Sequence, residues 1–208
     1  MSTTTTKWSI DTAHSTINFK AKHLMITTVT GTFKSFAADI ETIGNNFSTA
    51  NVKFSADVAS VFSGNEQRDE HLKSDDFFNA EKYPQITFHN TDVTRKSDRS
   101  FILHGKMTIR DVTMDIDLEV DFNGVVKDPW GVTKAGVSFR TKINRKDFGL
   151  KFHVLNEAGD LLVSDEIRIE ADIQMSAVEA WFYKRTKENV FNRKGFPNVW
   201  KPFSFKGI

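Results

Sequence analysis

The chain has 208 residues, with 28 Lys plus Arg against 27 Asp plus Glu, so its formal net charge is only +1. This balance argues against binding to nucleic acids, whose protein partners are usually strongly basic. Cysteine is absent, which excludes disulfide scaffolds, cysteine nucleophiles and thiolate metal sites.

The sequence contains no run of about 18 apolar residues, the length that a membrane-spanning helix needs. Its first ten residues, MSTTTTKWSI, lack the basic and apolar regions of an export signal, so we expect a cytoplasmic protein from the sequence as written. An export signal ahead of these residues would instead place the protein in the periplasm. The aromatic residues are dominated by 19 Phe, which favours a thick apolar interior.

Alternation of apolar and polar residues predicts about eight β-strands. In chain order, the apolar faces run through 17–21, 29–40, 52–58, 86–88, 101–109, 112–122, 133–143 and 161–173. The second of these changes phase near Ser35, as a β-bulge would allow. The pair Arg110-Asp111 and the segment 127–131 leave room only for short turns, which require antiparallel pairing. The sequence thus predicts an all-β fold that is either a sandwich or a closed barrel.

One helix is predicted between the strands, over residues 63–78. Ser63 and Glu66 have the spacing of a capping box, and the segment is rich in helix formers. Leu72, Phe77 and Phe78 are its few apolar side chains, so such a helix would plug one end of a barrel.

Residues 177–208 differ in composition from residues 1–176, and we interpret them as a C-terminal appendage. From Glu179 to Ile208 the chain carries 7 Lys or Arg against 2 Asp or Glu, together with eight aromatic residues. A solvated linker would carry fewer aromatics. We expect this tail to dock on the more acidic body or on a neighbouring subunit, which would make a homodimer. Contact with an anionic membrane or a nucleic acid is the less favoured interpretation.

Patterns that indicate catalysis are sparse. The sequence has no Gly-x-Ser-x-Gly elbow and no phosphate-binding glycine loop. The predicted helix supplies Arg68, Asp69 and His71, but no spacing places three metal ligands on one helical face. We therefore expect no catalysis, no metal and no cofactor. An enzyme that uses His71 and Asp69 as acid and base on a small apolar substrate ranks last among the alternatives.

Two polar residues interrupt the apolar faces. His23 continues the face of Ile17 and Phe19, and Asp165 lies between Val163 and Ile167. A polar group that faces a dry interior must be paired or must serve a ligand. These two side chains therefore either bond to loop backbone at a barrel rim or orient the polar end of a ligand.

Inward-facing rings and thioethers predict the wall of an apolar pocket, which suits an elongated apolar ligand. The predicted wall consists of Phe19, Phe33, Phe36, Phe54, Phe88, Phe101, Met107, Met114, Leu118, Phe139 and Ile143, and Phe122 shares the inward phase.

Several motifs follow one another between residue 7 and about residue 176. They are WSID at 8–11, HL at 23–24, VTGTF at 29–33, NEQRDEHLKSDDFF at 65–78, PQITF at 84–88, GKMTIRDVT at 105–113, INRKDFGL at 143–150 and LVSD at 162–165. In this order they resemble the YceI-like polyisoprenoid-binding proteins. The pattern ends near Ser176, so the resemblance does not cover the tail.

The resemblance implies an extended, lipocalin-like antiparallel β-barrel that holds a long isoprenoid chain, as in quinones or polyprenyl lipids, without catalysis. It makes His23, Arg68, Asp69, His71 and Asp165 motif positions and therefore candidates for ligand contact. The expected function is binding, transport or sequestration of such a lipid. The alternative is an interaction or assembly module whose barrel is filled by its own rings.

The charge of the lipid head group would determine which side chains bind it. An anionic head group would pair with Arg68, Lys142 or Arg145, because guanidinium and ammonium groups pair directly with phosphate. Of these, Lys142 points outward on the phase of its strand.

Overall fold

The computed structural model describes residues 4–155, 159 and 161–178. Of the predicted tail 177–208, only Ala177 and Val178 are among them, so the tail and any dimer contact that it makes lie outside the described residues.

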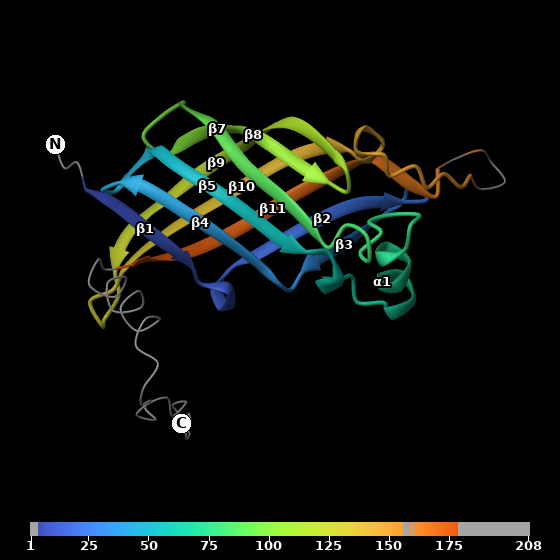
Figure 1. Cartoon of the computed structure of the whole chain (residues 1–208), viewed down its shortest axis with the longest axis horizontal. Helices are drawn as coiled ribbons and strands as arrows, with labels where there is room; N and C mark the ends of the chain where they lie inside the picture. The colour runs from blue at the N-terminus through green and yellow to red at the C-terminus, as the bar shows by residue number, and fades with distance from the viewer. Residues whose placement is uncertain (1–3, 156–158, 160, 179–208) are drawn as a thin grey trace, which may run out of the picture. The chain divides into compact units, whose positions relative to one another are not determined.

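The described chain is mostly β-sheet (Figure 1). Its strands are β1 (Thr5–Ile10), β2 (Thr16–His23), β3 (Thr27–Phe33), β4 (Phe36–Ile43), β5 (Asn46–Asp57), β6 (Val61–Phe62), β7 (Gln85–Arg95), β8 (Ser100–Ile109), β9 (Val112–Lys127), β10 (Thr133–Asn144) and β11 (Val163–Val178). The strands β1, β4, β5, β7, β8, β9, β10 and β11 form a closed ring in that order, because β1 also pairs with β11. The predicted lipocalin-like antiparallel barrel is confirmed, and the sandwich is excluded.

The last strand, β11, closes the ring. On one side it pairs with β10 from Asn144↔Glu166 to Lys134↔Ser176. On its other side it pairs with β2 over residues 163–172 and then with β1. Figure 1 shows β1 and β2 in blue, following one another along the barrel beside the orange β11. The two short strands β1 and β2 thus pair with one side of the long strand β11. Because β10 pairs with the other side, β11 has no exposed edge.

The prediction of one continuous strand with a bulge near Ser35 is wrong. The chain forms two strands there, since β3 pairs with β2 and β6 while β4 pairs with β1 and β5. The N–H of Lys34 donates to the Ser60 carbonyl at 3.1 Å, and the N–H of Ser35 donates to the Ser60 hydroxyl at 3.0 Å. The backbone N–H groups of Lys34 and Ser35 therefore bond to Ser60 instead of to a neighbouring strand. The strand β1 was not predicted either.

Both predicted short turns are confirmed. Arg110 and Asp111 join β8 to β9, with Arg110 at a φ of 57°. Between β9 and β10, the Asp128 carboxylate accepts from the N–H groups of Trp130 at 3.0 Å and Val132 at 2.9 Å.

The helix α1 (Glu66–Lys73) is shorter than predicted, and its cap differs. The Asn65 side chain accepts from the N–H of Arg68 at 2.9 Å, which makes Asn65 the N-cap. Ser63 instead donates its hydroxyl to Asp69. At the other end, the hydroxyl of Ser74 donates to the His71 carbonyl at 2.8 Å and competes with the next helical bond.

Glycine at position 105 allows two strands to pack closely. A Cβ at Gly105 would lie 2.5 Å from the His89 carbonyl oxygen and 2.5 Å from the Phe88 ring. The buried Phe88 ring therefore occupies the space that a side chain at position 105 would need, and β7 and β8 depend on this fit.

We expect Gly105→Ala to lower the free energy of unfolding by about 1–3 kcal/mol, the usual cost of overpacking. Gly136→Ala in β10 is the matched control, because its Cβ would meet Asn123 at an ordinary 3.4 Å. Urea unfolding of both variants measures the difference. Equal stability of the two variants would contradict this account of Gly105.

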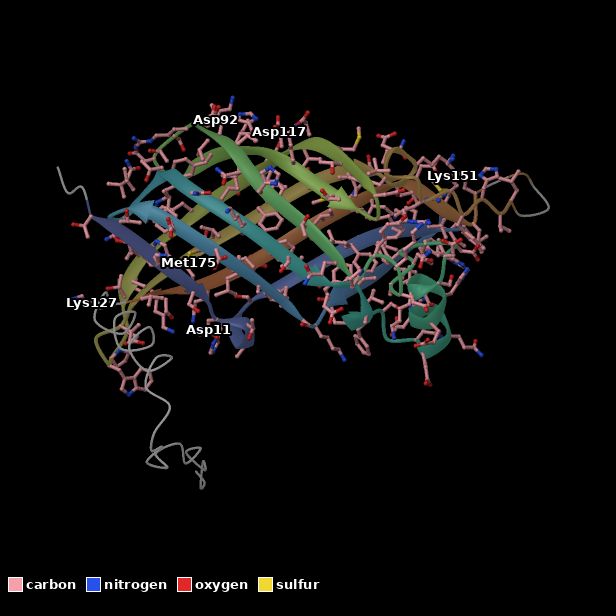
Figure 2. All side chains as sticks on the ribbon, in the orientation of Figure 1. Asp11, Asp92, Asp117, Lys127, Lys151 and Met175 are labelled. Carbon is pink, nitrogen blue, oxygen red and sulfur yellow. The ribbon has the colours of Figure 1, made fainter. Side chains whose placement is uncertain are left out.

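Asp11 lies in the connection from β1 to β2, where Figure 2 labels it, and a small network ties it to Gln174 of β11 and Lys134 of β10. Its carboxylate accepts from Gln174 at 3.1 Å and lies 3.0 Å from the His14 ring and 3.5 Å from the Lys134 ammonium. Burial raises the pKa of Asp11, but the hydrogen bonds and charge of these neighbours outweigh burial and hold the pKa below its ordinary value.

A lowered carboxyl pKa stabilises the folded state above the unfolded pKa of about 3.9, and this stabilisation is lost as pH falls through the folded pKa. We expect Asp11→Asn to cost less than about 1 kcal/mol at pH 7, because the network is partly solvated. The cost should shrink in urea unfolding as the pH falls through the lowered pKa of folded Asp11. A cost that is independent of pH would exclude an ionic role for Asp11.

Candidate functional site

The barrel encloses an apolar cavity of about 240 Å³. Of the described residues that line it, all are apolar except Asn18 and Arg145. The wall draws on every strand of the ring and on β2 and β3, because alternate residues of each strand point inward.

Most of the predicted wall lines this cavity. The residues that do so are Phe19, Phe33, Phe54, Phe88, Phe101, Met107, Leu118, Phe139 and Ile143. Phe36 does not line it but packs against Phe54, with ring centroids 6.4 Å apart. Met114 is 37% exposed and lies outside the wall. The pairing of β9 with β10 stops at Glu119, so the Met114 part of β9 has a ladder with β8 only.

One end of the cavity, which we call the β9–β10 end, is closed by rings on the barrel strands themselves. Phe47 at the start of β5 contacts Trp8 of β1 with centroids 5.3 Å apart and Phe122 of β9 with centroids 4.7 Å apart. The indole N–H of Trp8 donates to the buried Thr42 hydroxyl at 2.9 Å. This closure cannot move without disturbing the strands.

The other end, which we call the α1 end, is closed by residues on connections. Leu72 of α1 and Phe77 and Phe78 of the following turn line the cavity, as the predicted plug requires. Phe78 packs against Phe33 with centroids 5.9 Å apart, and Phe77 packs against Phe152 with centroids 4.9 Å apart. None of these three plug residues belongs to a strand of the ring.

Arg145 is the charged side chain at the α1 end, and its residue is only 2% exposed. Asn144 caps a short 3-10 helix, Arg145–Phe148, and Gly149 ends it at a φ of 73°, so the chain turns Arg145 inward just after β10. The guanidinium donates to the carbonyls of Leu150 at 2.8 Å, Ser164 at 3.0 Å and Val163 at 3.4 Å, and to the Asp165 carboxylate at 2.9 Å. These contacts use four of its five N–H groups.

The five predicted polar candidates lie in different surroundings. Asp165 binds Arg145 and also lies 2.7 Å from the Lys146 ammonium, so its charge is compensated. Half-buried His23 pairs in register with Val163 at the rim, next to the cavity wall. Arg68 donates to the Ser63 hydroxyl at 2.7 Å and to the Ser63 carbonyl at 2.8 Å.

Asp69 and His71 hold α1 in place. Buried Asp69 accepts from the Ser63 N–H at 2.8 Å, which ties the helix to the preceding loop. His71 lies 2.9 Å from Asp76, and its ring stands edge-on to Phe77 and Phe152, each at 5.0 Å. Of the five polar candidates, none lines the cavity.

Sequence reasoning missed Phe47 and did not place Arg145 in the wall. The β4–β5 register shifts between Glu41 and Ile43, so Phe47 is out of phase with Val52 and Phe54 although all three face inward. The cluster Gly44-Asn45-Asn46 just before Phe47 is the turn signal that marks the true start of β5.

Among the described residues, no three or more His, Cys, Asp or Glu side chains are placed to hold a metal ion. In the same part of the chain, no helix has the length and apolar character needed to span a membrane.

A sequence model of the YceI-like domain matches residues 8–175. The chain belongs to the YceI-like family. The UPF0312 protein SA2479 of Staphylococcus aureus strain N315 is 35% identical over 175 residues, which cover 84% of this chain and 99% of that protein.

Two solved structures share the fold of this chain. The YCEI protein of Campylobacter jejuni is 32% identical, with a TM-score of 0.67 over 76% of this chain and 90% of that one. BcnA of Burkholderia cenocepacia matches with 21% identity and a TM-score of 0.67 over 79% of this chain and 98% of its own, which shows the fold alone.

We expect Arg145→Met to destabilise this YceI-like barrel by about 3 kcal/mol, because it leaves buried carbonyls unpaired and Asp165 with a single partner. Lys142→Met is the control: its ammonium is 3.4 Å from Glu166 and its side chain is 62% exposed, so we expect a loss of less than about 1 kcal/mol. Denaturant titration compares the two, and similar losses would show that Arg145 is not a structural anchor.

Proposed function

We propose that this protein binds a long apolar lipid of isoprenoid type inside its barrel, as a carrier or sequestering protein rather than as an enzyme. The apolar cavity carries the proposal. Leaving 240 Å³ empty would cost on the order of 6 kcal/mol at about 24 cal/mol per Å³, a large part of a typical stability of about 5–15 kcal/mol. A bound apolar chain removes this cost, whereas a barrel meant only as a scaffold would be filled by its own side chains.

The ligand class has support from a structural neighbour. A polyisoprenoid binding domain from Saccharophagus degradans, implicated in plant cell wall breakdown, has a TM-score of 0.63 and 17% identity over 82% of this chain and 98% of its own. The present chain has the same barrel and an apolar interior that suits such a chain. Burial of apolar surface at about 25 cal/mol per Å² would supply most of the affinity.

The lipid enters at the α1 end in this proposal. The closure at the β9–β10 end consists of Trp8, Phe47 and Phe122 on ring strands, so opening it would break ladder hydrogen bonds. At the α1 end, Leu72, Phe77 and Phe78 lie on a short helix and a turn, which can move while the ring stays paired.

The head group would lie beside Arg145. Because Asp165 pairs with this guanidinium, Arg145 offers the cavity one spare N–H group and little uncompensated charge, while Lys146, the second cation on Asp165, has a 41% exposed side chain and does not line the cavity. This favours a neutral acceptor, such as a quinone carbonyl, over a diphosphate. His23 and Asp165, at the same rim, are the next side chains that a head group would meet.

Native mass spectrometry of the purified full chain, followed by solvent extraction and mass analysis, tests the proposal. We expect an adduct at the mass of a quinone or another neutral isoprenoid lipid. A mass without adduct that persists after incubation with ubiquinone and polyprenyl diphosphate would overturn it, and exclusive retention of the diphosphate would overturn the head-group assignment.

A pair of neighbouring variants tests the location. Ala38 lines the cavity, while Ala37, next to it in β4, is exposed. We expect Ala38→Phe to fill the interior and reduce lipid retention at least about tenfold. A Phe side chain buries about 150–250 Å² of apolar surface, and here it would do so in the space that the lipid occupies. Ala37→Phe should retain lipid as the parent does. Lipid per protein, measured after extraction, separates the two, and equal retention would place the ligand elsewhere.

A further inference from the structure

The turn between β2 and β3 has an unfavourable sequence for its conformation. Leu24 and Met25 are its central residues, with φ angles of 49° and 60°, and the Ile26 N–H donates to the His23 carbonyl at 3.1 Å. Two-residue turns with positive φ at both positions normally carry Asn-Gly, because larger side chains are strained there. This protein instead holds two large apolar residues in that conformation.

The same turn exposes apolar side chains. Met25 is 52% exposed and Ile26 is 77% exposed. Val154 and Leu155, at 44% and 49%, lie on the segment joined to this turn. The N–H of Leu24 donates to the Leu162 carbonyl at 3.0 Å, and the N–H of Leu162 donates to the Val154 carbonyl at 2.9 Å. We call Met25, Ile26, Val154 and Leu155 the apolar tip.

The apolar tip lies at the α1 end of the cavity. His23, just before the turn, pairs with Val163, and both Val163 and Ala21 line the cavity near Arg145. Exposed Lys22 and Lys151 flank the tip in the sequence, and Figure 2 shows Lys151 at the end of the barrel near α1. The neighbouring carboxylate of Asp165 is already bound by Arg145 and Lys146.

We propose that the apolar tip docks on the surface of a lipid bilayer and holds the α1 end of the cavity against it. Apolar side chains enter the boundary between head groups and acyl chains, and flanking lysines lie near lipid phosphates. The inference rests on the proposed function, since the bilayer is the source of an isoprenoid lipid. It explains why the strained turn keeps Met25 and Ile26 exposed, next to the end where that lipid would enter.

Vesicle binding by the full chain tests the docking surface. The double variant Met25→Asn with Ile26→Thr removes the apolar side chains but suits the turn, because Asn tolerates positive φ and Thr favours strands. We expect its partition coefficient onto phosphatidylcholine–phosphatidylglycerol vesicles, measured by sedimentation, to fall at least about tenfold from the loss of buried apolar area. Its thermal midpoint should not fall below that of the parent.

Trp130→Ser is the matched control, because Trp130 is 85% exposed in the turn at the opposite end of the barrel. We expect its partition to equal that of the parent. Parent-like partition of the double variant, or an equal loss in Trp130→Ser, would overturn the docking site. Loading of lipid from detergent solution is measured separately. Unchanged loading of the double variant, together with its loss of vesicle binding, supports docking. Failure of the parent protein to load any lipid, while its vesicle binding is intact, rejects the proposed function alone.

Discussion

Closure of the barrel along β11 is the constraint on which the rest of the structure depends. The long strand β11 must pair with β10 on one side and with both β1 and β2 on the other. When these ladders are complete, the ring has no free edge, and its inward residues lose contact with water. The apolar wall, the cavity and the burial of Arg145 all follow from that dry interior.

The two ends of the cavity are closed by different physical means. At the β9–β10 end, the Phe47 ring packs against both Trp8 and Phe122, and all three residues lie on strands that form the ring. At the α1 end, a short helix and a 3-10 helix bring side chains over the opening, and Arg145 ties the start of β11 to Leu150. The cavity thus has one end closed by ring strands and one end closed by connecting segments. This difference between the ends suits a protein that takes up a ligand at one side.

Local rules of sequence are broken at the α1 end. A buried guanidinium replaces an apolar wall residue, and Leu24 and Met25 adopt a conformation that favours Asn and Gly. Elsewhere the sequence suits the local structure, as where glycine at position 105 leaves room for the Phe88 ring. Departures of this kind cost stability and gather where a protein contacts its ligands and partners.

The sequence by itself determined most of the strands, the two short turns after β8 and β9 and most of the Phe wall, because alternation and turn chemistry act over a few residues. Only the tertiary structure decided where that alternation breaks. Phe47 turns inward through a register shift with β4, Met114 lies outside the wall where β10 no longer pairs, and the segment around Ser60 divides β3 from β4. Arg145 likewise reaches the interior only because Val163 and Ser164 of β11, together with Leu150 just after the 3-10 helix, present their carbonyls to it. Apart from the turn signal just before Phe47, these outcomes depend on contacts between separate segments of the chain, which no local pattern encodes.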